Sequence, residues 1–370
     1  MKITALVALI AATLECTAGA AGPSKRADPP PLVAPAGFTI TTYASVPGAR
    51  FMTLSADGSV YVSQTRAGRI VRLVDNGHGA ADSVVVVAEG LNQPHGMAFH
   101  RGAFYVANND GVVRFALGAD GRPTGAPTYV NHYSGGEGHN TRTIVFGADS
   151  AMYVSIGSSC NLCVERDSDR AVVMRYDESG ANGHVYARGL RNAVGLAVSP
   201  SGALWATVNE RDNIEPDHEN LPPDELEIVQ AGGNYGWPYC YGHTPNPEYA
   251  TDPAARCGSV IVPALGFQAH SAPLGIVFLA GASRFPSDYR GDALVAFHGS
   301  WNRTIPTGDK IVRVHVVGGR PVSYDDFITG WQRYDGSRWG RPVGMVVARD
   351  GSVLISDDQA GTIYRVSRSG

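Results

Sequence analysis

The stretch RDGSVLISDDQAGTIYRVSR, residues Arg349–Arg368, contains the pattern that decides the fold. It opens with a tight turn at Asp350-Gly351, continues as a short apolar strand, turns again and ends in a strand with alternating apolar side chains. Alternation with a period of two, together with many β-branched residues, indicates strands and not helices. We therefore interpret this stretch as a pair of consecutive antiparallel strands.

The same pattern recurs six times along the chain. The copies read ADGSVYVSQ from Ala56, RGAFYVANN from Arg101, ADSAMYVSI from Ala148, PSGALWATV from Pro200, RGDALVAFH from Arg290 and RDGSVLISD from Arg349. A strand–turn–strand unit that returns about every 45 residues is typical of the blade of a β-propeller. Six copies predict an all-β, six-bladed β-propeller over residues 37–370.

Two departures from the repeat predict how the ring is completed. The early strand GFTITTYASV (Gly37–Val46) has no partner of its own, so we expect it to complete the last blade and close the ring. The turn residues at positions 202 and 291 are 89 residues apart, which leaves room for an insertion. Propeller loops converge at the central channel, so we expect a ligand site there.

Composition limits the classes of function. The 370 residues include 30 Lys+Arg and 34 Asp+Glu, for a net charge of -4, which argues against a nucleic-acid partner. Lys2 and the apolar run Ala5–Leu14 predict a secretory signal peptide over residues 1–20. Residues 21–36 are expected to form a pro-segment or linker. Because no later run is apolar enough for a membrane span, we expect a secreted, extracellular protein.

The cysteines are consistent with secretion. Cys16 would leave with the signal peptide, and an even number would remain. In an oxidising compartment this predicts two disulfides, which we pair as Cys160–Cys163 and Cys240–Cys257. The alternative is a four-cysteine zinc site, but the wide spacing of the second pair disfavours it. The sequon that begins at Asn302 predicts N-glycosylation.

Several basic residues are expected at one end of the propeller. His139 lies in the Gly-rich segment SGGEGHNTRT before the third blade, and Arg191-Asn192 occupies the equivalent place before the fourth. Arg50, Arg303 and Arg341 are expected at further blade ends. An isolated histidine or arginine is more often structural. A group of arginines on one face, however, suits a ligand with several negative charges.

The segment HENLPPDELEIVQAGGNYGWPYC (His218–Cys240) is rich in oxygen ligands. Carboxylates and fixed backbone carbonyls of this kind suit a hard cation such as Ca²⁺. An acidic surface turn is the alternative interpretation.

Longer motifs resemble a known family. HNTRTIVFGADSAMYVSIG, RNAVGLAVSPSG and DELEIVQAGGNYGWPYC are similar to segments of the soluble quinoprotein glucose dehydrogenases. The closer resemblance is to the sorbosone dehydrogenase-like branch, which includes fungal pyranose dehydrogenases. That branch shares CNLC at Cys160, LPPDEL at Leu221, AHSAPLG at Ala269, HGSWNR at His298 and WGRPVG at Trp339.

The resemblance implies a pyrroloquinoline quinone (PQQ) cofactor and Ca²⁺ at the top of the propeller. His139 matches the general base that removes the sugar hydroxyl proton, and Arg191 matches the residue that polarises the quinone oxygen. The residues that it implies for cofactor binding are Arg50, Arg142, Arg191, Asn192, His270, Trp301, Arg303 and Arg341. Glu219 and Asn220 match the family's calcium-binding carbonyls.

The resemblance therefore predicts a dehydrogenase for a pyranose or keto-aldose, with hydride transfer to PQQ. Its electrons would pass to an external acceptor such as a cytochrome or a quinone. Two other classes stay open from the residues alone, namely a calcium-dependent six-bladed lactonase and a non-catalytic propeller that binds carbohydrate or protein.

Overall fold

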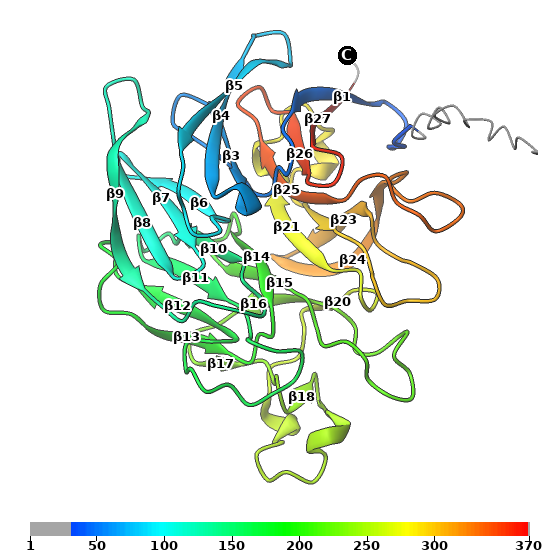
Figure 1. Ribbon diagram of the computed structural model, residues 1–370. Helices are drawn as coiled ribbons and strands as arrows, with labels where there is room; N and C mark the ends of the chain where they lie inside the picture. The colour runs from blue at the N-terminus through cyan, green and yellow to red at the C-terminus, as the bar shows by residue number, and fades with distance from the viewer. Residues whose placement is uncertain (1–30, 369–370) are drawn as a thin grey trace, which may run out of the picture.

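Six antiparallel sheets are arranged around one axis in the computed structural model, which describes residues 31–368 (Figure 1). Their innermost strands contact one another in a closed cycle that runs from the first blade to the sixth and back to the first. The predicted six-bladed β-propeller is therefore confirmed. Within the described residues, no helix has the length and apolar character needed to cross a membrane.

The first three blades follow one another along the chain. Blade 1 consists of β2 (Met52–Leu54), β3 (Val60–Gln64), β4 (Arg69–Asp75) and β5 (Ala81–Ala88), with the 3-10 turn η1 (Thr65–Ala67) between β3 and β4. Blade 2 consists of β6 (Met97–His100), β7 (Ala103–Asn108), β8 (Gly111–Leu117) and β9 (Pro123–His132). Blade 3 consists of β10 (Arg142–Phe146), β11 (Met152–Ile156), β12 (Val172–Tyr176) and β13 (His184–Arg188).

The other three blades contain the insertion and the closure of the ring. Blade 4 consists of β14 (Ala193–Val198), β15 (Leu204–Val208), β16 (Glu225–Val229) and β20 (Leu265–Gly266). Blade 5 consists of β21 (Pro273–Phe278), β22 (Ala293–Phe297), β23 (Lys310–Val317) and β24 (Arg320–Ile328), with η4 (Leu279–Gly281) and η5 (Ser287–Tyr289) before β22. Blade 6 consists of β25 (Pro342–Val347), β26 (Val353–Asp357), β27 (Thr362–Arg368) and β1 (Phe38–Ser45).

The second strand of every blade is buried along its whole length. These strands lie between neighbouring sheets, so side chains on both of their faces enter a hydrophobic core. In blade 6, for example, Leu354 packs with residues of blade 1, whereas Val353 and Ile355 pack with residues of blade 5. This two-sided burial explains why the repeated segments of the sequence are continuous apolar runs.

The first strand of the chain closes the ring, as predicted. β1 pairs with β27 in antiparallel register from Phe38↔Arg368 to Ser45↔Thr362, with one irregularity between Thr42 and Ala44. Blade 6 therefore combines the beginning and the end of the propeller, and its last edge strand comes from the opposite end of the sequence.

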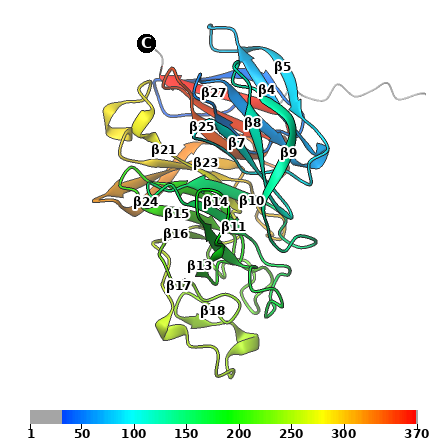
Figure 2. The same cartoon turned by 90° about the vertical axis from the view of Figure 1, so that its left-hand side faces the viewer.

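The insertion lies between β16 and β20, where the long interval predicted it. It contains β17 (Gly233–Asn234), the hairpin β18 (Cys240–Tyr241) and β19 (Thr244–Pro245), and the 3-10 turns η2 (Pro247–Tyr249) and η3 (Cys257–Ser259). β17 pairs in parallel with β13, so the insertion adds a fifth strand to blade 3. Figure 2 shows the rest of the insertion projecting beyond the blades at β18.

Both predicted disulfides are confirmed. Cys160 and Cys163 are bonded to each other in the loop between β11 and β12, and Cys240 and Cys257 close the insertion. Since all four cysteines are used in these bonds, the zinc alternative does not hold.

The predicted signal peptide (1–20) and most of the predicted linker (21–36) lie outside the described residues. The described end of that linker is hydrogen-bonded to the propeller. The backbone of Val33 exchanges two hydrogen bonds with Thr329, at 2.9 and 3.0 Å, immediately after β24.

The closing strand is anchored by an aromatic cluster, and this gives a test of the fold. The Phe38 ring makes edge contacts with Phe285, Phe327 and Tyr289 of blade 5, at centroid distances of 4.9, 5.1 and 5.4 Å. Phe38→Ala should lower the free energy of unfolding by about 2–3 kcal/mol, because it leaves these rings without their partner. Urea unfolding measures the change. Tyr334→Ala, which removes an exposed ring, is the control and should cost less than about 0.5 kcal/mol. Equal losses in the two variants would contradict an anchoring role for Phe38.

Candidate active site

The loops that lead into the innermost strands meet at one end of the propeller. Arg50 precedes β2, His139 precedes β10, Arg191-Asn192 precedes β14 and Arg341 precedes β25. Because every innermost strand starts at the same end, residues far apart in the sequence come together there.

Two cavities lie at this end. The smaller one, of about 160 Å³, is lined by His139, Arg191, Asn192, Asn209, Glu210, Asp212, Asp224, His270, Ala272, Gly299, Trp301 and Arg341. The larger one, of about 550 Å³, includes Arg50, Gln64, Gln93, Asn140, Thr141, His298, Arg341 and Asp358 in its lining. The cavities are neighbours, since Arg341 belongs to both and Asn140 follows His139 in the chain. The structure thus brings together most of the predicted basic residues.

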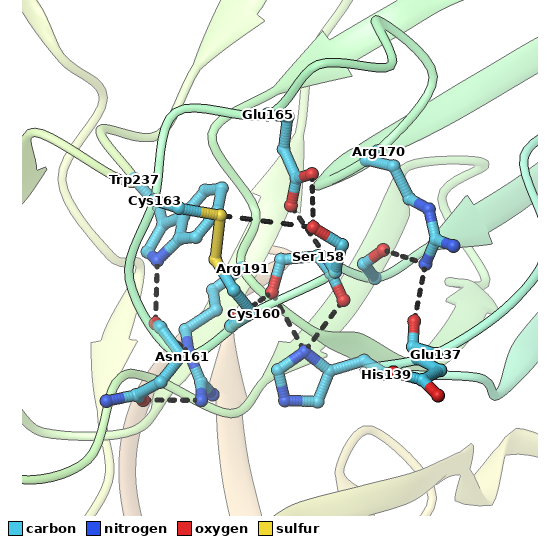
Figure 3. Close-up of a disulfide and its surroundings, with 12 residues drawn as sticks. Glu137, His139, Ser158, Cys160, Asn161, Cys163, Glu165, Arg170, Arg191 and Trp237 are labelled. Atoms are coloured by element: carbon cyan, nitrogen blue, oxygen red, sulfur yellow. Dashed lines mark hydrogen bonds between the residues drawn. A yellow bond between two sulfur atoms is a disulfide. The ribbon is translucent and has the colours of Figure 1, made fainter.

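The hydrogen bonds of His139 define the tautomer of its neutral ring (Figure 3). Its Nδ1 lies 3.1 Å from the carbonyl oxygen and 2.8 Å from the hydroxyl oxygen of Ser158. The carbonyl can only accept, and the hydroxyl proton is donated to the Cys160 carbonyl at 2.7 Å. Nδ1 must therefore carry the hydrogen, which leaves Nε2 with a free lone pair.

The electrostatic surroundings keep this imidazole neutral. Burial, and then the positive charge of Arg191, lower the pKa of His139 to about 3. A neutral imidazole with an unprotonated Nε2 can accept a proton from a ligand at any pH above this value.

Arg191 is almost fully buried beside this base, with 4% of its surface exposed. Its Nε donates to the Asn161 carbonyl at 2.9 Å, and its Nη1 donates to the carbonyls of Asn209 and Glu210 at 2.9 and 2.7 Å. Its Nη2 donates to the side chain of Asn161 at 2.8 Å. The guanidinium is therefore fixed by four hydrogen bonds to neutral oxygens, and Asp212 Oδ2 lies 3.7 Å from its Nη2.

Three carboxyl groups also line the smaller cavity. Glu210 and Asp224 are buried, and burial raises the pKa of both. Asp212 accepts a hydrogen bond from Asn302 at 3.0 Å and lies 3.4 Å from Nδ1 of His270. Three carboxyl groups therefore surround Arg191, which is more than its single positive charge can neutralise.

The larger cavity has a network of its own. Asp358 accepts from Arg50 at 2.7 Å and contacts His298 Nε2 at 3.0 Å. Burial, followed by the charge of Arg50, lowers the pKa of His298 to about 4. Arg341 donates to the carbonyls of His298 and Gly299 at 2.7 and 2.8 Å. Two arginines from blades 1 and 6 are therefore held side by side at this cavity.

Arg142, which was predicted to contact a cofactor, lies elsewhere. It is completely buried, and it donates to the His139 carbonyl at 2.6 Å and to Asn109 and the Ser134 carbonyl at 3.3 Å. It does not line either of the two cavities described above. Its position is that of a support for the His139 loop.

The predicted calcium residues also lie apart from the cavities. The Glu219 carbonyl accepts a hydrogen bond from Arg303, and the Asn220 side chain donates to Asp217 at 2.9 Å. Neither Glu219, Asn220 nor Arg303 contributes to the lining of the two cavities. The acidic residues of the same loop that line the smaller cavity are Glu210, Asp212 and Asp224.

Three further predicted residues lie around the smaller cavity. His270 lines it and is buried, and Trp301 lines it while 73% of its surface is exposed. Asn302 donates from its amide nitrogen to Asp212, and a glycan on that nitrogen would leave one N–H for this contact. Glycosylation at Asn302 stays a prediction.

Sequence reasoning missed Ser158, Asn161 and Asp212. The first two flank or lie within the Cys160–Cys163 turn, which was noted for its disulfide and for its resemblance to the family motif. Asp212 was passed over because the residues after Asp217 are richer in oxygens. A signal was present in both cases, since each segment directly follows the second strand of its blade, at the same end as His139.

The chain was compared with known proteins. A family model described as TrAA12-like matches residues 32–369. The pyrroloquinoline quinone-dependent pyranose dehydrogenase of Coprinopsis cinerea is 25% identical over 86% of this chain and 52% of its own length. The pyrroloquinoline quinone-dependent sugar dehydrogenase of Hypocrea jecorina is 25% identical, over 86% of this chain and 85% of its own length. This chain thus spans about half of the Coprinopsis protein.

A solved structure has the same fold. The calcium structure of a Trichoderma reesei family AA12 carbohydrate-active enzyme superposes with a TM-score of 0.79 at 24% identity, over 93% of this chain and 98% of that one. An uncharacterized protein of Borreliella burgdorferi is 32% identical over 62% of this chain and 60% of its own length.

The buried histidines give a test of the electrostatics at this end of the molecule. His95 precedes β6 and has no exposed surface, and burial, followed by the charge of Arg50, lowers its pKa to about 3. Between pH 6.5 and pH 3 the unfolded chain therefore binds a proton at His95 that the folded chain does not. The contribution of His95 to the free energy of unfolding therefore decreases as the pH falls. When the pH is lowered from 6.5 to 4, the free energy of unfolding of the wild type should fall by about 3 kcal/mol more than that of His95→Leu. Urea unfolding of both proteins at several pH values measures the difference, and parallel curves would contradict it.

Proposed function

Because this chain belongs to the TrAA12-like family of pyrroloquinoline quinone-dependent oxidoreductases, we propose that it is a sugar dehydrogenase. In this proposal it oxidises a pyranose or keto-aldose and passes the electrons to an external acceptor such as a cytochrome or a quinone. One observation carries it above all: an imidazole with a free Nε2 lies beside a buried arginine, in a cavity that adjoins two more arginines.

The residues present fit PQQ. The cofactor is planar and has three carboxylates, so it needs a slot and several cations. Arg50 and Arg341 supply cations at the larger cavity, and Arg191 supplies one at the smaller cavity, with Asn192 beside it. We propose these four as the cofactor residues. Arg142 and Arg303 line neither cavity, and they donate to backbone carbonyls of the protein, so we assign them supporting roles.

His139 is the proposed general base. When bound, PQQ supplies an electrophilic quinone that accepts a hydride from the sugar carbon. Nε2 of His139 accepts the hydroxyl proton of the sugar, and Ser158 holds the ring so that this nitrogen faces the ligand. The fixed guanidinium of Arg191 places positive charge where a bound oxygen gains negative charge.

For Ca²⁺, the predicted pair Glu219 and Asn220 fits less well than its neighbours. Glu210, Asp212 and Asp224 line the smaller cavity instead, but their carboxylate oxygens do not converge on one point, so a cation there would contact only some of them. Carboxylate oxygens are suitable ligands for Ca²⁺. We therefore propose that Asp212 and its neighbours, rather than Glu219 and Asn220, bind calcium.

Secretion is part of the proposal. Its support is the predicted signal peptide and the two disulfides, which are typical of oxidising compartments. Trp301, exposed at the mouth of the smaller cavity, offers an aromatic face to a sugar ring.

A calcium-dependent lactonase is the second candidate, because Asn192, Asn209 and the three carboxyl groups all line the smaller cavity. Such an enzyme would hydrolyse lactones with Ca²⁺ alone. Assays of lactone hydrolysis without PQQ, and of dye reduction with PQQ, distinguish the two.

The first test of this proposal is cofactor reconstitution. Protein that has been stripped with EDTA should not reduce a redox dye with sugar, and addition of PQQ together with Ca²⁺ should restore the activity. Either component alone should restore little. Dye reduction and the absorption spectrum of the bound quinone are the measurements. Full activity in the stripped protein would refute a quinoprotein function.

The second test separates the base from the cofactor residue. His139→Ala should lower kcat by about 10²–10⁴-fold and leave the Kd for PQQ within a few-fold, because the imidazole acts on the substrate. Arg191→Ala should weaken PQQ binding and lower kcat together. His184→Ala, at an exposed histidine of β13, serves as the control and should behave as the wild type. If His139→Ala turned over at the normal rate, the base would have to be another residue.

A further inference from the structure

The loop between β11 and β12 reaches both functional side chains of the proposed site. Ser158 begins this loop, and the Cys160–Cys163 disulfide follows at once (Figure 3). Its backbone nitrogen donates to the Arg191 carbonyl at 2.8 Å, and its own carbonyl accepts from the His139 nitrogen at 3.0 Å. Ser158, two residues before the disulfide-closed turn, therefore bridges the two residues on which the proposed chemistry depends.

Asn161, inside that turn, controls the direction of the Arg191 guanidinium. A guanidinium has five N–H bonds. One is donated to the Asn161 carbonyl and one to the Asn161 side chain, while two from Nη1 go to the Asn209 and Glu210 carbonyls. A single N–H on Nη2 makes no hydrogen bond, and Asp212 Oδ2 lies 3.7 Å from this nitrogen. Since the other hydrogen on Nη2 is donated to Asn161, this residue sets where the free one points.

The position of Asn161 itself has to be maintained. It is an exposed residue, and an exposed amide side chain keeps many rotamers unless it is held. Its Oδ1 accepts from the Asp212 nitrogen at 2.9 Å, and its Nδ2 donates to the Asp212 carbonyl at 3.0 Å. Its carbonyl also accepts from the Trp237 indole at 3.4 Å. Asn161 thus joins the loops of blades 3 and 4 and the insertion.

The disulfide fixes the backbone on which these contacts depend. Only Asn161 and Leu162 separate the bonded cysteines, so the turn cannot open while the bond is intact. The same turn presents the Cys160 carbonyl that accepts the Ser158 hydroxyl proton at 2.7 Å, and this contact in turn orients His139. One short covalent ring therefore supports both sides of the site.

We infer that Asn161 is a positioning residue for Arg191, and that the Cys160–Cys163 bond is what holds it in place. This inference rests on the proposed function, because it treats Arg191 as a residue that touches the cofactor. The second disulfide does not position Arg191. Cys240–Cys257 stabilises the projecting insertion, and its cysteines make no contact with Arg191 or His139 among the described hydrogen bonds.

A set of four variants tests the inference by titration with PQQ in the presence of Ca²⁺. Asn161→Ala, and the double replacement Cys160→Ser/Cys163→Ser, should each raise the Kd for PQQ about tenfold or more and shift the absorption spectrum of the bound quinone. The two changes combined should do little more than the stronger of them, because the bond acts through Asn161. The matched control, Cys240→Ser/Cys257→Ser, should lower the unfolding midpoint and leave the Kd within twofold.

The outcomes separate this inference from the proposed function. A wild-type chain that binds no PQQ overturns the proposed function and this inference with it. A wild type that binds PQQ, with an Asn161→Ala variant of equal affinity, overturns this inference alone. If the fold-increases in Kd caused by Asn161→Ala and by removal of the disulfide multiply in the combined variant, the disulfide does not act through Asn161. Asn161→Ala keeps the disulfide, and a native circular dichroism spectrum with a cooperative unfolding transition verifies that the variant is folded.

Discussion

Closure of the ring is the constraint on which the rest of the structure depends. The hydrogen bonds between β1 and β27 join the two ends of the propeller, and only then do the six innermost strands contact one another in a complete cycle. The candidate site needs this cycle. Arg50 comes from blade 1 and Arg341 from blade 6, so their common cavity exists only where the ring is joined. Strand pairing at the outer edge thereby determines the geometry at the axis, although β1 contributes no side chain to either cavity.

The sequence was sufficient to predict the fold, because every blade carries the same local signal. In each blade, a turn is followed by a strand that is buried on both faces, and such a strand appears in the sequence as a continuous apolar run. Six of these runs identify six blades. The unpaired first strand and the long interval predicted the closure and the insertion for the same reason. The residues directly before the innermost strands were predictable too, since equivalent positions in each blade face the same end. His139 and Arg191 meet in one cavity on this basis.

Other parts of the site could not be read from residue types. Arg142 and Arg191 are both arginines near the start of an innermost strand, yet Arg142 is the first residue of β10 and turns inward beneath His139. The loop between β15 and β16 has no periodicity that would tell which of its residues reach the axis. The resemblance pointed to the carbonyls of Glu219 and Asn220, whereas Glu210, Asp212 and Asp224 line the smaller cavity. Arg191 is fixed largely by backbone carbonyls. Because a residue of any type has a backbone carbonyl, the sequence does not indicate which residues make such contacts.

The fifth strand of blade 3 has a consequence for how molecules of this protein meet one another. An outer strand with unpaired backbone groups can pair with a strand of a second molecule, which is a route to aggregation. β17 covers part of that edge in blade 3, at Ala187 and Arg188 of β13. No strand in residues 31–368 does the same for β5, whose ADSVVVVA sequence leaves Val84 and Val86 43% exposed. The outer edge of blade 1 is therefore open to pairing with a strand of a second molecule, as are the edge strands β9 and β24, and none of these three strands lines either cavity.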